Sequence, residues 1–331
     1  MNANIKRRDF ITLLGGAAAW PLAARAQQPS MPVIGFLNSG SPDGYAPMVA
    51  AFRQGLSETG FVEGRNVAVE YHWLVGKYDQ LPALVADLVS RRVGLIATPG
   101  NGPATLAAKA ATSTIPIVFG IAQDPVQVGL VASLARPGGN ATGINFFSRE
   151  VVAKRLRLLH DFLPSAVRVA VLLNPANAGS AEFTTQEVQG AAPTLGVQIQ
   201  VLKATTIREI DAAFATLASE RPDALFVAGD GFFLDRRVQF ATLAARDRIP
   251  AAYAQNDFVK VGGLMSYGTD NAEMFRQVGV YAGRILKGEK PAELPVLQST
   301  KFEFAINLQT ARALNIEVPS GVLAIADEVI E

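Results

Sequence analysis

The chain has 331 residues, with 30 lysines and arginines, 29 aspartates and glutamates, two histidines and no cysteine. A net charge of +1 argues against a nucleic-acid-binding protein, which needs a basic surface. The lack of cysteine excludes disulfides, thiolate nucleophiles, iron–sulfur clusters and cysteine-ligated zinc. With two histidines, a histidine-rich metal centre is not expected either, so we predict no metal site.

Residues 1–26 have the layout of a signal peptide. Basic residues at 6–8 precede an apolar run at 10–20, and residues 24–26 form a small-x-small cleavage site. The apolar run is about half the roughly 20 residues that cross a bilayer, although an uncleaved membrane anchor is the alternative. The paired arginines resemble a twin-arginine export signal. Cleavage after Ala26 would leave a slightly acidic mature protein in the periplasm.

From residue 32 onward, short apolar runs alternate with segments of helical periodicity. This pattern is typical of βα units around a parallel sheet. In the first half it predicts strands at residues 33–37, 94–98 and 115–119, and an edge strand at 67–71. In the second half it predicts strands at residues 168–173, 197–202, 224–228, 249–253 and 264–267. The sequence therefore predicts an α/β fold.

The two halves also contain a weak internal repeat. Residues 107–120 and 241–254 are identical at five of 14 positions, and each segment follows a predicted strand–loop–helix unit. Structural duplication is one explanation, and chance matching between alanine-rich helices is the other. Duplication predicts two similar lobes. We expect residues 31–146 plus about 269–293 in lobe 1, and 147–268 plus about 294–331 in lobe 2.

Ligands of open α/β sheets bind beyond the carboxyl ends of the strands, next to helix N-termini. The loops at those positions carry amides, hydroxyls, glycines, aromatic rings and two carboxylates. Backbone N–H groups there can hold a carboxylate, an aspartate can pair with an ammonium, and aromatic rings can enclose an apolar body. The candidate ligand-binding residues are Asn38, Ser39, Asn101, Asp124, Asn174, Asp230, Phe232 and Tyr267.

Each candidate also has a purely structural interpretation. Asp124 precedes a proline, as helix N-caps often do, and Asp230 could cap the helix that follows it. Asn174 precedes a proline and could simply start a turn. Phe232 and Tyr267 could belong to the core instead of the wall of a cleft. These alternatives stay open at the level of sequence.

The sequence lacks the common short motifs of nucleophilic catalysis and nucleotide binding. The sequence has no G-x-S-x-G nucleophile elbow, no G-x-G-x-x-G and no G-x-x-x-x-G-K-[ST]. Neither histidine lies in a setting that would pair it with a nucleophile. We therefore predict a protein that is not an enzyme and that carries no cofactor.

Several segments, taken in order, resemble the extracytoplasmic substrate-binding proteins of ABC transporters, in the group that includes tryptophan- and tyrosine-type binders. The segments are Gly60–Asn66, Ile115–Phe119, Asp124–Val126 with Gly129–Val131, Arg136–Gly143, Gly262–Gly268 and Ala326–Glu331. The resemblance covers nearly the whole mature chain. The loop Gly229–Phe233 departs from the Thr/Asp/Asn-type loop of the tryptophan binders, so the resemblance leaves the ligand open.

The resemblance implies a type I periplasmic-binding-protein fold, with two doubly wound parallel-sheet lobes joined by a hinge. It also implies capture of a small-molecule solute, such as an amino acid or an aromatic carboxylate, for an ABC transporter permease. By position, it places the candidates other than Phe232 on loops that line the cleft in such proteins. The alternatives are an exported α/β enzyme and a ligand-sensing module for a membrane receptor.

Overall fold

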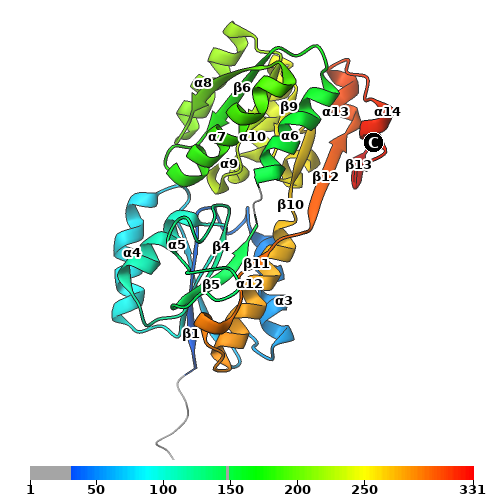
Figure 1. Cartoon of the computed structure of the whole chain (residues 1–331). Helices are drawn as coiled ribbons and strands as arrows, with labels where there is room; N and C mark the ends of the chain where they lie inside the picture. Colours follow the sequence, from blue (N-terminus) through cyan, green and yellow to red (C-terminus); the bar gives the residue numbers. More distant parts are fainter. Residues whose placement is uncertain (1–30, 147–148) are drawn as a thin grey trace, which may run out of the picture.

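The computed structural model describes residues 31–146 and 149–331, which form two lobes, each built on one sheet with helices around it (Figure 1). The predicted signal peptide and its export motif lie outside the described residues. Both sheets are covered on their two faces by helices. This arrangement explains why most strands read as continuous apolar runs instead of alternating ones.

Lobe 1 contains a six-stranded sheet in the order β11-β5-β4-β3-β1-β2, in which all pairs are parallel. Its strands are β1 (Val33–Asn38), β2 (Ala68–Trp73), β3 (Leu95–Pro99), β4 (Ile117–Ile121), β5 (Ala141–Asn145) and β11 (Leu297–Gln298). Its helices are α3 (Ala46–Glu58), α4 (Leu81–Ser90), α5 (Gly102–Ala111) and α12 (Asn271–Leu286), with short 3-10 turns η1 (Tyr78–Gln80) and η2 (Pro291–Glu293).

Lobe 2 contains a seven-stranded sheet in the order β13-β12-β10-β9-β8-β6-β7. Its strands are β6 (Arg168–Leu173), β7 (Gln198–Lys203), β8 (Ala224–Val227), β9 (Ala251–Tyr253), β10 (Met265–Thr269), β12 (Phe302–Asn307) and β13 (Glu328–Ile330). Its helices are α6 (Arg149–Phe162), α7 (Ala178–Leu195), α8 (Ile207–Glu220), α9 (Gly231–Asp235), α10 (Arg237–Asp247), α11 (Asn256–Lys260), α13 (Leu308–Ala313) and α14 (Ser320–Leu323).

The α/β fold with two parallel-sheet lobes is confirmed, and each predicted strand has a counterpart. One strand pair is not parallel: β12 runs antiparallel to β10, where the chain re-enters lobe 2. Strand β5 was not predicted, since Gly143 interrupts its apolar run. A Cβ at Gly143 would lie 2.1 Å from the carbonyl oxygen of Phe119, so this glycine allows β5 to pack against β4.

Helices α3 and α12 pack together through glycines. A Cβ at Gly55 would lie 1.9 Å from the carbonyl oxygen of Arg276, and one at Gly279 would lie 2.1 Å from that of Phe52. Because these neighbours are backbone atoms, only glycine permits the two helices to approach so closely. This contact fixes α12 in lobe 1, and the N-terminus of α12 points toward lobe 2 (Figure 1).

The chain passes between the lobes three times, and the crossings are linked. The Thr269 hydroxyl donates a hydrogen bond to the carbonyl oxygen of Phe146. Lys301 Nζ donates to Asp270 Oδ2 at 2.6 Å, and the Asp270 backbone N–H donates to the Lys301 carbonyl at 3.2 Å. Strand β11 still belongs to lobe 1, so the third crossing follows residue 298 instead of the expected position near 294. These linked segments form the hinge region.

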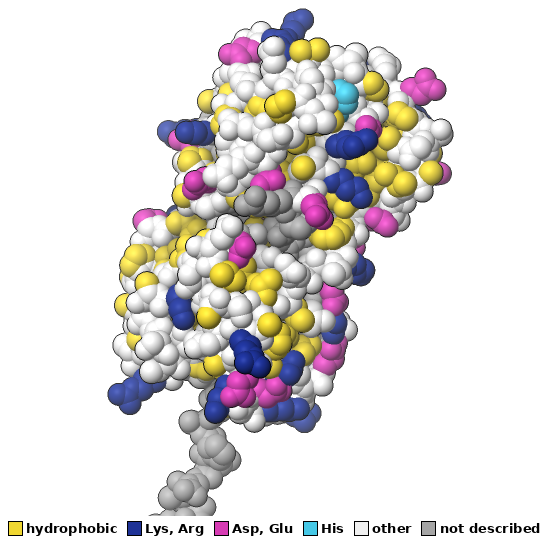
Figure 2. Space-filling model, viewed as in Figure 1, with side chains coloured by type: hydrophobic (Ala, Val, Ile, Leu, Met, Phe, Trp, Pro, Cys, Tyr) yellow, Lys and Arg dark blue, Asp and Glu magenta, His cyan; other side chains and the backbone are white. Residues whose placement is uncertain are grey.

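The two lobes touch each other beyond the hinge region. Ser41 Oγ in lobe 1 donates a hydrogen bond to Asp235 Oδ1 in lobe 2 at 3.0 Å. A Cβ at Gly76 of lobe 1 would lie 3.2 Å from the ring of Phe232 in lobe 2. A single cluster of buried apolar side chains extends through both lobes. The two lobes are therefore in contact, which is a closed arrangement. On the surface, basic and acidic side chains are interspersed over both lobes (Figure 2).

Candidate functional site

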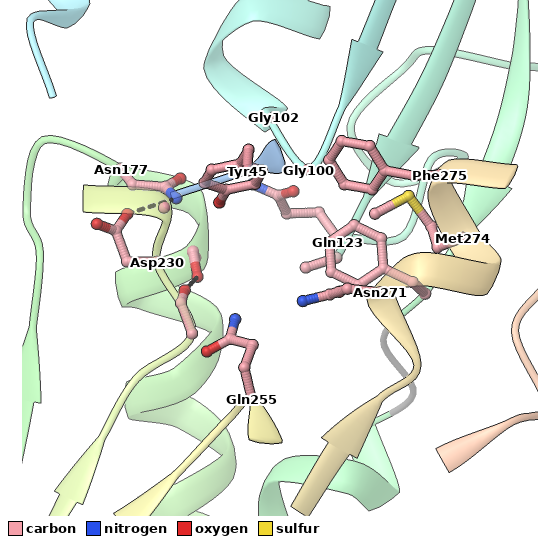
Figure 3. Close-up of a pocket in the computed structure, with 15 residues that line it drawn as sticks. Tyr45, Gly100, Gly102, Gln123, Asn177, Asp230, Gln255, Asn271, Met274 and Phe275 are labelled. Carbon is pink, nitrogen blue, oxygen red and sulfur yellow. Dashed lines mark hydrogen bonds between the residues drawn. The ribbon is translucent and has the colours of Figure 1, made fainter. Parts of the chain in front are cut away.

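A cavity lies between the two lobes, where the carboxyl ends of the two sheets face each other (Figure 3). It contains about 530 Å³ of empty space, including a part open to solvent, and we call it the interlobe cavity. Both lobes supply its lining. The residues are Tyr45, Gly100, Gly102, Ala122, Gln123, Phe146, Asn271, Met274 and Phe275 from lobe 1 and its hinge, and Asn177, Ser180, Gly229, Asp230, Gly231 and Gln255 from lobe 2.

Six helices begin at the interlobe cavity. In α3, α5, α7, α9, α11 and α12, the N-cap or the first helical residue belongs to the lining. The first N–H groups of a helix have no partner within it, and the helix dipole adds partial positive charge at that end. The backbone around the cavity is therefore suited to an anionic group such as a carboxylate.

The lobe 1 wall of the cavity is largely apolar. Tyr45 and Phe275 lie with ring centroids 5.9 Å apart, and Met274 from the same turn of α12 lies beside them (Figure 3). Burial, together with the nearby carboxylates of Asp235 and Asp230, raises the pKa of the Tyr45 phenol, so the hydroxyl stays protonated. This wall offers aromatic surface and one hydroxyl group.

The lobe 2 wall carries the one charged side chain of the fifteen lining residues, Asp230. Its Oδ1 accepts hydrogen bonds from Asn174 Nδ2 at 2.9 Å and from the N–H groups of Phe232 and Phe233 at 3.0 and 3.3 Å. Its Oδ2 accepts one bond from Asn177 Nδ2 at 3.2 Å. Burial raises the pKa of Asp230, and these four bonds oppose the rise. The carboxylate is thus held in place and has unused acceptor capacity at Oδ2.

Two buried amide atoms near the cavity have no partner among the described residues. They are Asn177 Oδ1, in the lining, and Asn101 Nδ2, between the lining residues Gly100 and Gly102. Buried polar atoms are normally satisfied, because leaving one unpaired costs about 1–3 kcal/mol. One acceptor and one donor are therefore available to a guest molecule.

The structure places the predicted site residues in three groups. Asp230 lines the cavity. Asn38, Ser39, Asn101 and Asn174 are buried next to it but outside its lining. Asn38 Nδ2 donates to the Pro99 carbonyl at 2.9 Å, and Asn174 donates to Asp230, so these two amides support the loops.

The other three candidates lie away from the interlobe cavity. Asp124 is exposed, and its Oδ1 accepts from the backbone N–H of Val126 at 2.8 Å, as a capping residue does. Phe232 belongs to the buried cluster that joins the lobes. Tyr267 packs in the core of lobe 2, with Lys154 Nζ 4.7 Å from its ring centroid. Asp124 therefore acts as a capping residue, and Phe232 and Tyr267 pack in the core, which are the structural roles that the sequence had left open.

Several lining residues were not among the predicted candidates. Gln123 and Asn177 lie in the loops after β4 and β6, and Ser180 lies on the first turn of α7, but the sequence gives no sign of which of these side chains faces inward. Gln255 follows β9 and could have been found by the same rule. Met274 and Phe275 are the fourth and fifth residues of α12, where a buried apolar residue cannot be distinguished from the core by sequence.

The chemistry of the site is limited by the side chains that the fold brings together. Within residues 31–146 and 149–331, no three His, Cys, Asp or Glu side chains come together as metal ligands would. In that same part of the chain, no helix combines the length and hydropathy of a membrane span. The chemistry available in the interlobe cavity is therefore that of amides, hydroxyls, backbone groups, aromatic rings and one carboxylate.

Known proteins resemble this chain over most of its length. The tyrosine-binding protein of Clostridioides difficile (strain R20291) is 25% identical over 266 residues, which are 80% of this chain and 76% of that protein. A crystal structure of the ABC domain from Streptococcus pneumoniae in complex with L-Trp has a TM-score of 0.81 and 24% identity, covering 91% of this chain and 100% of that one.

A third similar protein was solved in a different state. The ligand-free, open structure of a substrate binding protein with adhesive properties from Clostridium difficile has a TM-score of 0.62 and 25% identity, covering 90% of this chain and 99% of that one. Residues 33–330 match the family described as ABC transporter substrate binding protein. With that match over nearly all described residues, the chain belongs to the family of ABC transporter substrate-binding proteins.

Proposed function

We propose that the protein captures a small zwitterionic solute, with an aromatic amino acid as the best candidate, and delivers it to an ABC transporter permease. The observation that carries this proposal is the contrast between the two walls of the interlobe cavity. Asp230 supplies one buried negative charge on lobe 2, while Tyr45, Met274 and Phe275 supply an apolar wall on lobe 1.

The charges of an amino acid match the polar groups around the cavity. An ammonium group can pair with Asp230 Oδ2. A carboxylate can accept from N–H groups at the N-termini of α3, α7 and α11, whose N-cap side chains make no capping hydrogen bond. The unpaired Asn101 Nδ2 can donate a hydrogen bond to the carboxylate, and the unpaired Asn177 Oδ1 can accept one from the ammonium. An aromatic side chain would then lie against Tyr45 and Phe275. A relative is named for tyrosine and another was solved with L-Trp, which supports this choice.

Binding by lobe closure follows from the division of the lining between two lobes. A solute shifts an open–closed equilibrium only by its difference in affinity for the two states, so it must contact both lobes. The cavity residues come from both lobes, and the hinge region lies at one side of the cavity through Phe146. We propose that the solute stabilises the closed form and that the permease recognises that form.

A thermal-shift comparison of L-tyrosine with three truncated analogues tests the proposal. Tyramine lacks the carboxylate, hydroxyphenylpropionate lacks the ammonium, and L-alanine lacks the ring. L-Tyrosine should raise the unfolding midpoint most, because it alone carries the ammonium, the carboxylate and the ring. A ligand at 100 times its Kd adds about 2.7 kcal/mol of stability, so the shift is measurable. Small-angle scattering should show compaction on addition of L-tyrosine. Unchanged midpoints with the whole set would contradict the proposed class of solute.

We also propose that residues 1–26 direct export to the periplasm and are removed after Ala26. The apolar segment is too short to span a bilayer, and the paired arginines favour the twin-arginine route. A mature protein that starts at Gln27, measured by mass spectrometry after periplasmic extraction, is the expected result.

A further inference from the structure

A second cavity adjoins the interlobe cavity at the mouth of the same cleft. It contains about 1340 Å³ of empty space, largely open, and we call it the outer pocket. Its lining includes Asp124, Gln127 and Asn145 from lobe 1, and Glu182 and Phe183 from α7 of lobe 2. The two cavities share two lining residues, Ala122 and Gln123. Of these two, only Gln123 has a side chain long enough to separate the spaces.

The Gln123 amide is wedged between two glycines, one from each lobe. A Cβ at Gly179, on the first turn of α7, would lie 2.2 Å from Gln123 Nε2. A Cβ at Gly102, the first residue of α5, would lie 2.9 Å from Gln123 Oε1. Both glycines thus leave the space that the amide occupies. The closed form seats this side chain across the gap between α5 and α7 (Figure 3).

The backbone at Gln123 is held by hydrogen bonds, whereas its side chain is held by packing alone. Asn145 Nδ2 donates to the carbonyl oxygens of Gln123 at 2.8 Å and of Ile121 at 3.2 Å. By contrast, the side-chain amide of Gln123 makes no hydrogen bond to another described residue, and the side chain is half-buried. Removal of the side chain would therefore open the partition and leave the backbone hydrogen bonds of the loop in place.

We propose that Gln123 is a specificity-determining residue that limits the length of the solute by closing the interlobe cavity against the outer pocket. This inference rests on the proposed function. With Gln123 seated, a solute must fit within the interlobe cavity. With Gln123 removed, the two spaces become continuous, and a longer solute with the same zwitterionic group can extend between Gly102 and Gly179.

The outer pocket also restricts the chemistry of that extension. Asp124, Glu150 and Glu182 line it, and among the side chains that the structure describes no lysine or arginine does. An anionic extension would be repelled, whereas a neutral one would not. The appropriate probes are therefore L-tyrosine and two longer derivatives that keep its zwitterionic group and add no charge, O-methyl-L-tyrosine and O-benzyl-L-tyrosine, both extended at the ring.

Calorimetric titration of the full mature protein with these three probes tests the proposal. Gln123→Ala should improve the affinity for at least one extended probe relative to L-tyrosine by about tenfold or more, the range seen for removing a steric limit in a binding pocket. Gln127→Ala is the matched control, because Gln127 lines only the outer pocket. That control should leave the ratio of affinities within about twofold of wild type.

A second variant tests the seat of the amide independently. Gly179→Ala places a methyl group 2.2 Å from Gln123 Nε2, so the Gln123 side chain must move. The ratio of the affinities for an extended probe and for L-tyrosine should therefore change in the wild-type background and stay the same in Gln123→Ala. Unchanged ratios in Gln123→Ala, or an equal effect of Gly179→Ala in both backgrounds, would overturn the inference while leaving the proposed function intact. Absence of L-tyrosine binding in the wild-type protein would overturn both.

Discussion

The two walls of the interlobe cavity are built by different physical means. The lobe 1 wall is positioned by packing, since Met274 and Phe275 lie on a helix that glycines hold against α3. The lobe 2 wall is positioned by hydrogen bonds, since Asp230 is fixed by two amides and two backbone N–H groups. Shape selectivity should therefore depend on lobe 1, and recognition of charge on lobe 2.

Removal of the charge on lobe 2 should have the largest effect. Asp230→Asn keeps the size of the side chain but leaves the ammonium of the solute without a charged partner. We expect the affinity for L-tyrosine, measured by calorimetry, to fall by roughly 2–5 kcal/mol. Asp124→Asn is the matched control, because Asp124 also caps a turn but is exposed and outside the cavity. Equal losses in both variants would show that capping, and not charge, is responsible.

The pH dependence follows from the same carboxylate. Burial raises the pKa of Asp230 above its ordinary value of 3.8, so in the closed, ligand-free protein its charge destabilises the fold at neutral pH. That cost is relieved as the pH falls through the raised pKa. An ammonium partner needs the charged form, so L-tyrosine affinity should decline over the same pH interval in wild type. Asp230→Asn should lack this decline.

A change in the packing that holds the lobe 1 wall should have the next largest effect. Gly279→Ala places a methyl group 2.1 Å from the Phe52 carbonyl, so α3 and α12 must separate. We expect a loss of about 1–3 kcal/mol in unfolding free energy from denaturant titration, as for other overpacked sites. L-Tyrosine affinity should fall as well, because Met274 and Phe275 shift with α12.

Gly190→Ala provides the control for that experiment. Gly190 lies on the exposed side of α7, and apart from the adjacent helix backbone no atom of the described residues lies within 4 Å of the position that an added methyl group would take. Alanine should therefore stabilise the helix by about 0.5–1 kcal/mol. If both glycine variants changed stability in the same direction and by similar amounts, close helix packing would not explain the result.

The smallest expected effect concerns a contact that joins the two lobes. Ser41→Ala removes the hydrogen bond to Asp235 and should weaken closure, and with it L-tyrosine affinity, by about 1 kcal/mol. Small-angle scattering of the ligand-free variant should give a larger radius of gyration than that of the ligand-free wild-type protein. Ser57→Ala, on the exposed face of α3, should leave both measurements unchanged. A Ser41 variant as compact and as tight-binding as wild type would exclude this contact as a closure element.

The fold was predictable because most strands are buried on both faces and therefore appear as short apolar runs. Strand β5 was not, because the reason for Gly143 lies in its contact with the Phe119 carbonyl on another strand. For the candidate site, the strand-end rule located the loops and Asp230. It could not tell that Asn38 and Asn174 use their amides to support those loops, because that depends on tertiary contacts.

The triple crossing of the chain restricts how the lobes can move. A single connecting segment would let one half rotate freely, whereas three neighbouring segments tied through Phe146, Thr269, Asp270 and Lys301 resist torsion and leave bending as the soft motion. The two lobes would then open and close along the same path. Groups encoded more than a hundred residues apart, such as Tyr45 and Asp230, would meet at the same separation in every cycle.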